Sequence, residues 1–199
     1  RSEVVSDGRV ADVEHTRVGI RRIEIARDGL RINGERMFLR GTNRHQEHPY
    51  VGFAVPEAAQ YRDARRIKEA GFDYIRLSHY PHAPAFMDAC DELGIVVMNC
   101  IPGWQYFGSD PAFADLQYRN VRDLIRRDRN HPSVVLWEVS LNETDMPPEF
   151  IAVRNSARFA RACALTPSVY VMSPSAPAFI HSSCNHTSAR PCTGIVSGG

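Results

Sequence analysis

Apolar side chains change their spacing along the chain, and the spacing predicts two kinds of structure. In residues 23–25 (IEI) apolar and acidic side chains alternate, as in a half-buried strand. Residues 30–39 contain Asn33-Gly34, a pair typical of two-residue hairpin turns. Residues 17–39 are therefore predicted to be β-structure.

From Pro56 onward, helical patterns alternate with short apolar runs. Pro56, Pro84 and Pro111 each stand near a predicted helix start, where proline is tolerated best. The predicted helices and strands are, in order, 55–71, 72–78, 83–94, 95–100, 110–128 and 133–139. For the last helix we expect Asp110 as N-cap and an inner stripe of Phe113, Leu116, Val121, Leu124 and Ile125. Repeated strand–helix units predict a parallel sheet with right-handed crossovers and both faces covered.

Composition limits the classes of partner. The 199 residues carry a net charge of +1, and 43% are hydrophobic, so no strong field favours nucleic acid. No apolar run approaches the roughly 18 residues that span a bilayer, and we expect no membrane partner. The five cysteines include no CxxC pair, which argues against a disulfide framework or a zinc site. Cys90 and Cys100 lie in apolar runs and are expected in the core. The first residue is not Met, so we expect a longer parent protein, and the compartment is not indicated.

The sequence changes character after about residue 154. Residues 155–199 contain no Asp, Glu or Lys, and Ser, Pro and Ala dominate. Two interpretations stay open, a flexible low-complexity tail or a frameshifted segment. The run HSSCNH (181–186) has metal-binding residue types but no scaffold, so no metal site is predicted.

Polar and aromatic residues collect at the end of each predicted strand, in GTNRHQEHP (41–49), IRLSHYPH (75–82), Asn99 with IPGWQYF (101–107), and finally Asn142-Glu143. The carboxyl ends of parallel strands meet at one edge of a sheet, where α/β enzymes place their sites. Each residue alone has a structural explanation: Glu143 as a helix-start carboxylate, His79 as a core histidine, Arg76 as an ion-pair partner, Trp104 and Trp137 as packing. Because polar clusters follow all four predicted strands, a shared functional site explains them better than four unrelated structural roles.

The motifs FLRGTNRHQEHP, IRLSHYP, DACDELGI and RDRNHPSVVLWEVSLNET, in this order, resemble the catalytic domain of glycoside hydrolase family 2. The resemblance covers about residues 17–150. It implies an α/β fold, a partial (β/α)8 TIM barrel of about four βα units, preceded by the end of an immunoglobulin-like β-sandwich and followed by an irregular tail. The corresponding domains are 1–28 (sandwich remnant and linker), 29–154 (first half of the barrel) and 155–199 (tail).

The resemblance also implies a retaining exo-glycosidase with a carbohydrate substrate. Glu143 matches the acid/base, which alternately donates and accepts a proton. Asn142 matches the residue that binds the sugar 2-hydroxyl. The other matching or sugar-stacking candidates are His79, Arg44, His45, Arg76, Trp104 and Trp137.

Departures from the family pattern limit this interpretation. A retaining enzyme needs a second carboxylate, and neither Glu138 nor Glu149 has the right context. We therefore expect the chain alone to be inactive and to expose an apolar sheet edge. MNCIPGWQYF has no acid or His, so no magnesium and no cofactor are expected there.

The substrate and several alternatives stay open. IPGWQYF favours β-galactosidase-like specificity over β-glucuronidase or β-mannosidase. An inactive sugar-binding fragment, a doubly wound nucleotide-binding domain, and a homo-oligomeric parent also remain. The nucleotide-binding domain is disfavoured because residues 41–49 form no glycine-rich phosphate loop.

Overall fold

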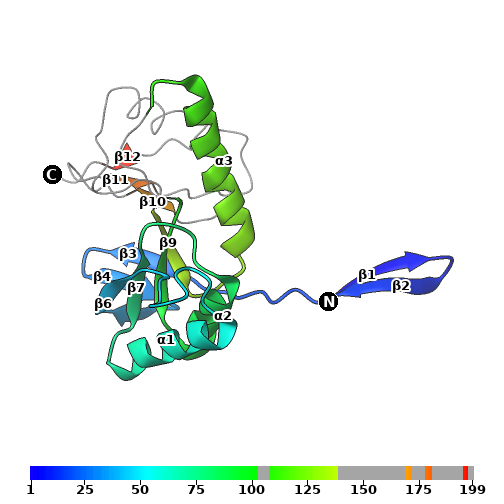
Figure 1. Ribbon diagram of the computed structural model, residues 1–199, viewed down its shortest axis with the longest axis horizontal. Coiled ribbons are helices and arrows are strands. Elements are labelled where there is room, and N and C mark those ends of the chain that lie inside the picture. The colour runs from blue at the N-terminus through cyan, green and yellow to red at the C-terminus, as the bar shows by residue number, and fades with distance from the viewer. Residues whose placement is uncertain (103–107, 139–168, 172–177, 181–194, 197–199) are drawn as a thin grey trace.

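The computed structural model describes residues 1–102, 108–138, 169–171, 178–180 and 195–196. Its first element is an antiparallel hairpin of β1 (Ser2–Ser6) and β2 (Arg9–Glu14), which extends away from the other elements (Figure 1). The turn residues Asp7 and Gly8 have φ of 52° and 73°, the left-handed conformation that Asp-Gly adopts readily. This hairpin was not predicted, although an Asp-Gly pair is typical of hairpin turns.

A three-stranded antiparallel sheet follows, made of β3 (Ile23–Ala26), β4 (Gly29–Ile32) and β5 (Glu35–Met37). Asn33 and Gly34 connect β4 to β5 with φ of 54° and 88°. Two consecutive left-handed residues make the turn that suits the twist of a hairpin. The predicted hairpin is confirmed, although the predicted immunoglobulin-like sandwich is not decided by these three strands.

A four-stranded parallel sheet forms the centre of the molecule, with strand order β6-β7-β8-β9. Its strands are β6 (Gly41–Arg44), β7 (Tyr74–Leu77), β8 (Val96–Cys100) and β9 (Val134–Glu138). The connecting helices are α1 (Glu57–Glu69), α2 (Pro84–Leu93) and α3 (Pro111–Asp128). This is the predicted partial α/β barrel, and the predicted helices and strands from 55 to 139 agree with it within a few residues.

The first strand of the parallel sheet lies later than predicted. Residues 41–44 were predicted to be in the loop after the strand, but they form β6 itself. Gly41 lies so close to Tyr74 that a β-carbon would collide with the Tyr74 ring and carbonyl oxygen. Thr42 and Asn43 are exposed because β6 is an edge strand of this sheet. The expected exposed edge is therefore present at β6, but it is polar rather than apolar.

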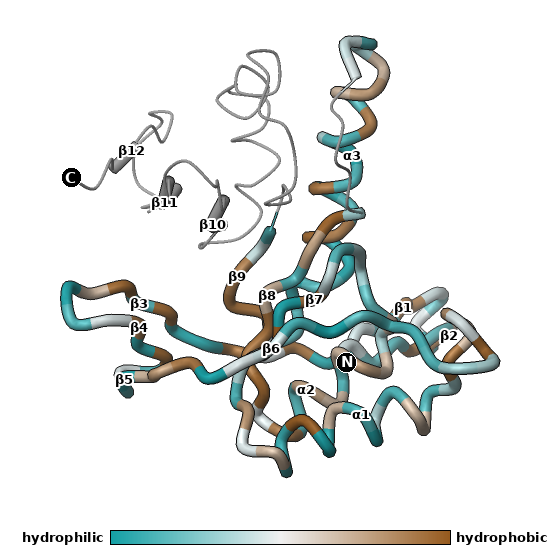
Figure 2. Tube along the Cα trace, turned by 60° about the vertical axis from the view of Figure 1, so that its left-hand side comes forward, coloured by the Kyte–Doolittle hydropathy of each residue, from teal (hydrophilic) through white to brown (hydrophobic). Residues whose placement is uncertain are grey.

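The hydrophobic core lies between the parallel sheet and its helices. It contains Ile75, Leu77, Phe86, Met87, Cys90, Val97, Val134 and Trp137, all at most 2% exposed. Figure 2 shows β8 and β9 as mostly brown, hydrophobic parts of the chain trace at its centre, while α1 is largely hydrophilic. Burial of Cys90 and Cys100 confirms the prediction that both are core residues.

Helix α3 begins as predicted but packs over only part of its length. The Asp110 side chain accepts a hydrogen bond from the Ala112 amide at 2.8 Å, so the predicted N-cap is confirmed. Val121, Leu124 and Ile125 are buried, whereas Leu116 is 43% exposed. The prediction for Leu116 was wrong because the buried face of α3 begins at Gln117 and Tyr118, and Leu116 lies outside that face.

The remaining described strands are β10 (Val169–Val171), β11 (Ala178–Ile180) and β12 (Ile195–Val196), which pair antiparallel. They lie in the segment predicted to be an irregular tail. Over the described residues, no helix combines the length and apolar character needed to cross a bilayer.

Candidate active site

A buried ion pair lies on the inner face of the parallel sheet, at its carboxyl end. Arg76 of β7 and Glu138 of β9 alternate with Ile75, Leu77 and Trp137, which belong to the helix-facing core, so they project from the opposite face. Arg76 donates to both carboxylate oxygens of Glu138, with Nε–Oε2 and Nη2–Oε1 distances of 2.9 and 2.5 Å. The Glu138 side chain is 1% exposed and that of Arg76 16%. Because β8 lies between β7 and β9, the pair bridges two strands across a third.

His79 and Cys100 lie beside this pair. One ligand atom from each of His79, Cys100 and Glu138 lies within 4.8 Å of the other two. Nitrogen, sulfur and oxygen together suit a thiophilic cation such as Zn2+. Both Glu138 oxygens, however, already bind the Arg76 guanidinium. The arrangement therefore favours an ion pair over a metal centre.

Tyr74, at the start of β7, belongs to the same electrostatic group. Burial, and to a smaller extent the Glu138 charge, raises the pKa of Tyr74 to about 12, although the Arg76 charge opposes the shift. The phenol is therefore protonated throughout the physiological range.

Aromatic and imidazole rings cluster in the loops after β6 and β7. The His45 ring meets the His79 ring edge-on, with 5.8 Å between centroids, and lies 6.1 Å from Tyr80. The Gln46 amide donates to the Tyr80 hydroxyl, and the Gln46 side-chain oxygen accepts from the Ala83 amide at 2.6 Å. The two loops are thus tied together, and His45 and His79 reach the same edge of the sheet, as expected from the sequence.

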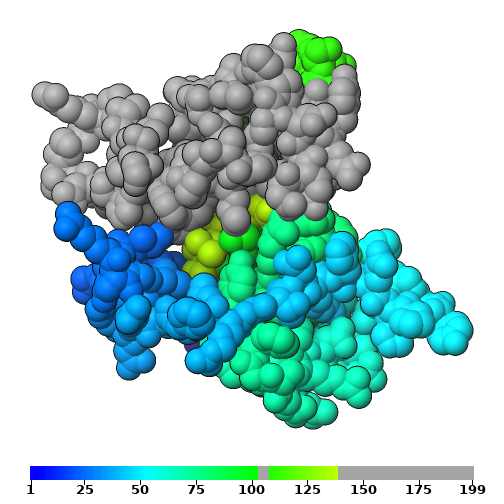
Figure 3. Space-filling view, turned by 90° about the vertical axis from the view of Figure 1, so that its left-hand side faces the viewer, coloured from blue at the N-terminus to red at the C-terminus, as the bar shows by residue number. Residues whose placement is uncertain are grey.

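The loop after β6 also exposes apolar surface. Tyr50, Val51 and Phe53 are exposed, and the Phe53 ring packs edge-on against Tyr80. In Figure 3 the cyan part of the chain, near residue 50, projects from the molecule. This loop therefore extends from the ring cluster outward.

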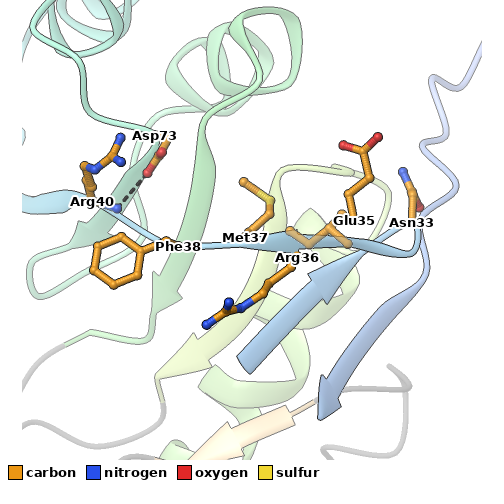
Figure 4. Close-up of a pocket in the computed structure, with 8 residues that line it drawn as sticks. Asn33, Glu35, Arg36, Met37, Phe38, Arg40 and Asp73 are labelled. Atoms are coloured by element: carbon orange, nitrogen blue, oxygen red, sulfur yellow. Dashed lines mark hydrogen bonds between the residues drawn. The ribbon is translucent and has the colours of Figure 1, made fainter. Parts of the chain in front are cut away.

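A separate open pocket lies at the other end of the strands. It is lined by Ile32, Asn33, Glu35, Arg36, Met37, Phe38, Arg40 and Asp73 (Figure 4). The Arg40 amide donates to Asp73 at 2.7 Å, and these residues immediately precede β6 and β7. Since TIM-barrel chemistry sits at the carboxyl ends of the strands, this pocket is not the candidate active site.

Comparison with known proteins identifies the family of this chain. The sequence model of the glycosyl hydrolases family 2, TIM barrel domain, matches residues 23–172. The chain belongs to glycosyl hydrolase family 2. The family match extends past residue 154, into the segment predicted to be a tail.

Curated relatives of this family 2 chain include β-galactosidases. The protein from Thermoanaerobacter pseudethanolicus is 44% identical over 144 residues, covering 71% of this chain and 19% of its own length. The protein from Thermoanaerobacterium thermosulfurigenes is 43% identical over 135 residues, covering 67% of this chain and 19% of its own length. The chain thus spans about a fifth of these relatives.

Solved structures of glycoside hydrolases are also similar. A family 2 member from Bacteroides cellulosilyticus has a TM-score of 0.75 at 29% identity, covering 86% of this chain and 23% of that one. An FMN-binding β-glucuronidase from Facaelibacterium prausnitzii L2-6 has a TM-score of 0.72 at 35% identity, covering 78% and 25%.

Two predicted sugar-binding residues of the family 2 chain lie in packed surroundings. The Arg44 guanidinium lies 4.0 Å above the Phe86 ring and donates to Gln60 and Asp63 at 2.8 and 2.9 Å. Trp137 is 2% exposed within the helix-facing core. The packing alternative therefore describes Trp137 better than a sugar platform. The Arg44 side chain likewise contacts α1 and α2, through Gln60, Asp63 and Phe86.

Asn99 and His82 also turn away from the expected pocket. Asn99 was grouped with the strand-end polar residues, but its amide donates to Asp128 of α3 at 2.5 Å. It therefore faces the helices, and that expectation was wrong. His82 is buried between carbonyl oxygens of Tyr80 and Arg44, and burial lowers its pKa to about 4, so it is neutral.

The structure thus unites His45, Arg76 and His79, and it adds Glu138, Cys100 and Tyr74. Sequence reasoning weighed Glu138 only as a nucleophile and rejected it. Glu138 directly follows Trp137 on β9, so it points away from the helix-facing core and toward Arg76. Trp104, Asn142 and Glu143 lie outside the described residues.

Proposed function

We propose that the chain is part of the catalytic domain of a retaining β-glycosidase that removes terminal sugars by double displacement. The observation that carries the proposal is the convergence of Arg76, His79 and Glu138 at the carboxyl end of the parallel sheet. A barrel interior used only for stability is filled mainly by branched apolar side chains. A charged pair beside an imidazole at this end is typical of a functional site.

The proposed mechanism assigns the acid/base role to Glu143. Its protonated carboxyl donates a proton to the glycosidic oxygen while a second carboxylate attacks the anomeric carbon and displaces the aglycone. Glu143 then removes a proton from water, which attacks the glycosyl-enzyme and releases the sugar. Asn142 binds the sugar 2-hydroxyl. Glu138 does not suit the nucleophile role because Arg76 occupies both of its oxygens.

For the substrate we propose a neutral β-hexoside, with β-galactoside first. Binding a glucuronide carboxylate calls for a cation in the pocket, and Glu138 neutralises Arg76. The β-galactosidase relatives support the same choice, while the β-glucuronidase structures keep the glucuronide as the second candidate.

The test uses the full-length enzyme that contains this chain, with 4-nitrophenyl β-galactoside, β-glucuronide and β-mannoside as activated substrates and the corresponding methyl β-glycosides as substrates with a poor leaving group. Glu143→Gln should lower kcat/KM on substrates with poor leaving groups by about 10²–10⁴-fold. Activated leaving groups should suffer less, and added azide should restore turnover as β-glycosyl azide, because the anion needs no general base. Glu149→Gln is the matched control and should behave as wild type.

Two results would contradict the proposal. Near-normal turnover of substrates with poor leaving groups by the Glu143→Gln variant would contradict the acid/base assignment. Binding of a galactonolactone by a wild-type enzyme that hydrolyses none of the three glycosides would indicate the sugar-binding alternative. We expect the 199-residue chain alone to be inactive, because its sequence offers no suitable second carboxylate.

A further inference from the structure

Glu138 has no role in the double-displacement scheme, yet it is among the most buried charged side chains of the described residues. It ends β9, the strand that leads toward Asn142 and Glu143. Its register partner on β8 is Cys100, and its ionic partner Arg76 pairs in register with Met98. Adjacent strands lie about 4.8 Å apart, so the two side chains together cover the roughly 10 Å between β7 and β9.

Stability alone is a poor explanation for this pair. Removing a carboxylate and a guanidinium from water costs several kcal/mol for each ion, and apolar replacements of such pairs are often neutral or stabilising. The bidentate geometry does provide something an apolar pair cannot. It fixes the plane of the guanidinium and keeps the local net charge at zero.

We infer that Glu138 is a positioning residue for glycoside hydrolysis, which holds Arg76 in one orientation and cancels its charge beside His79. The inference rests on the proposed function. Arg76 and His79 lie on one short segment, and His79 reaches the ring of His45 across the loops. Among the residues that the structure describes, the titratable groups around the pair include Tyr74, His79 and Cys100, from β7, its loop and β8. Movement of Arg76 would therefore disturb the positions of His79 and His45 at the carboxyl end of the sheet.

The decisive variant is Glu138→Gln in the full-length enzyme, which keeps the shape and removes the charge. We expect kcat to fall about 10²-fold with little change in KM, because small misplacements of catalytic groups have effects of that size. The basic limb of the pH–kcat profile should move to lower pH, because the uncompensated Arg76 cation favours deprotonation of nearby carboxyl groups. Glu138→Asp keeps the charge and should restore the wild-type pH profile.

Asp128→Asn is the matched control. The Asp128 side chain is also 1% exposed and also accepts two hydrogen bonds from one arginine, Arg127, both at 2.7 Å. It binds Asn99 on the helix-facing side of the sheet. We expect Asp128→Asn to lower the unfolding temperature about as much as Glu138→Gln does, and to leave the pH–kcat profile unchanged.

A double variant, Glu138→Met with Arg76→Met, replaces the pair by apolar groups and covers the case in which Glu138→Gln does not fold. It should fold and be inactive. The inference is overturned by a wild-type kcat and pH profile in Glu138→Gln, by equal pH shifts in Asp128→Asn, or by an active double variant. Failure of both pair variants to fold, with Asp128→Asn folded, would make the pair purely structural. Normal turnover in Glu143→Gln, measured in parallel, would instead contradict the proposed function.

Discussion

Replacing Asp91 by asparagine should destabilise the connection between α2 and β9 in a pH-dependent way. Asp91 Oδ2 lies 2.7 Å from His131 Nδ1, and Asp91 Oδ1 accepts the Ser133 amide at 3.0 Å. The two side chains are 6% and 17% exposed. The variant Asp91→Asn would keep an acceptor for the Ser133 amide but lose the charge opposite His131. Hydrogen bonds to charged groups contribute about 1.5–3 kcal/mol, and partial exposure of His131 reduces this to about 1–2 kcal/mol.

The pH dependence follows from the direction of both pKa shifts. The hydrogen bond to Asp91 raises the pKa of His131 above 6.5 in the folded protein. The interaction with protonated His131 therefore contributes fully to the free energy of unfolding below pH 6.5, and this contribution is lost as pH rises through the pKa of His131 in the folded protein. Burial alone would raise the pKa of Asp91, but hydrogen bonds from His131 and Ser133 lower it below 3.8. Its contribution is present above 3.8 and is lost as pH falls through the folded value. The effect should therefore be largest between 3.8 and 6.5.

Thermal unfolding followed by circular dichroism, near pH 5.5 and again near pH 9, measures the effect. For a chain of this size about 1–2 kcal/mol corresponds to a fall of about 3–6 °C in Tm. The fall should be smaller near pH 9, where neutral His131 still donates a hydrogen bond but carries no charge. Asp88→Asn is the control, since Asp88 is 51% exposed and lies 3.6 Å from Arg17. Equal losses at both pH values, or an equal loss in Asp88→Asn, would refute the reasoning.

Two further substitutions test the start of the barrel and the start of α3. Gly41→Ala should lower the free energy of unfolding by about 1–3 kcal/mol, because the new methyl group collides with Tyr74. Urea unfolding should then show a lower midpoint. An unchanged midpoint would mean that β6 does not approach β7 this closely. Asp110→Ala should cost about 1 kcal/mol through loss of the hydrogen bond to the Ala112 amide, whereas Asp110→Ser should retain most of the stability in the same assay.

Local signals predicted most of the elements correctly. Asn33-Gly34 makes a hairpin turn and Asp110-Pro111 starts a helix because those preferences depend on a few neighbouring atoms. The runs of apolar residues predicted β7, β8 and β9 because strands covered on both faces need apolar side chains throughout. β6 was missed as a strand because its four residues, Gly-Thr-Asn-Arg, carry no such pattern, and only pairing with β7 defines it.

The candidate site was less accessible to sequence reasoning. Residue types and their strand-end positions indicated where polar groups gather, and the family motifs indicated what chemistry to expect there. They did not indicate that Arg44 would bind Gln60 and Asp63, or that Asn99 would bind Asp128. Those partners lie 16 to 29 positions away along the chain.

The sequence by itself therefore determined the helices and strands between residues 55 and 139 and the family, and it indicated at which edge of the sheet to expect the candidate site. Tertiary structure decided which polar side chains meet there. On a strand, neighbouring residues point to opposite faces, so Trp137 enters the core while Glu138 meets Arg76 on the inner face, 62 positions away in sequence. That outcome depends on the phase of each strand relative to its neighbours, and the phase exists only once the sheet has formed.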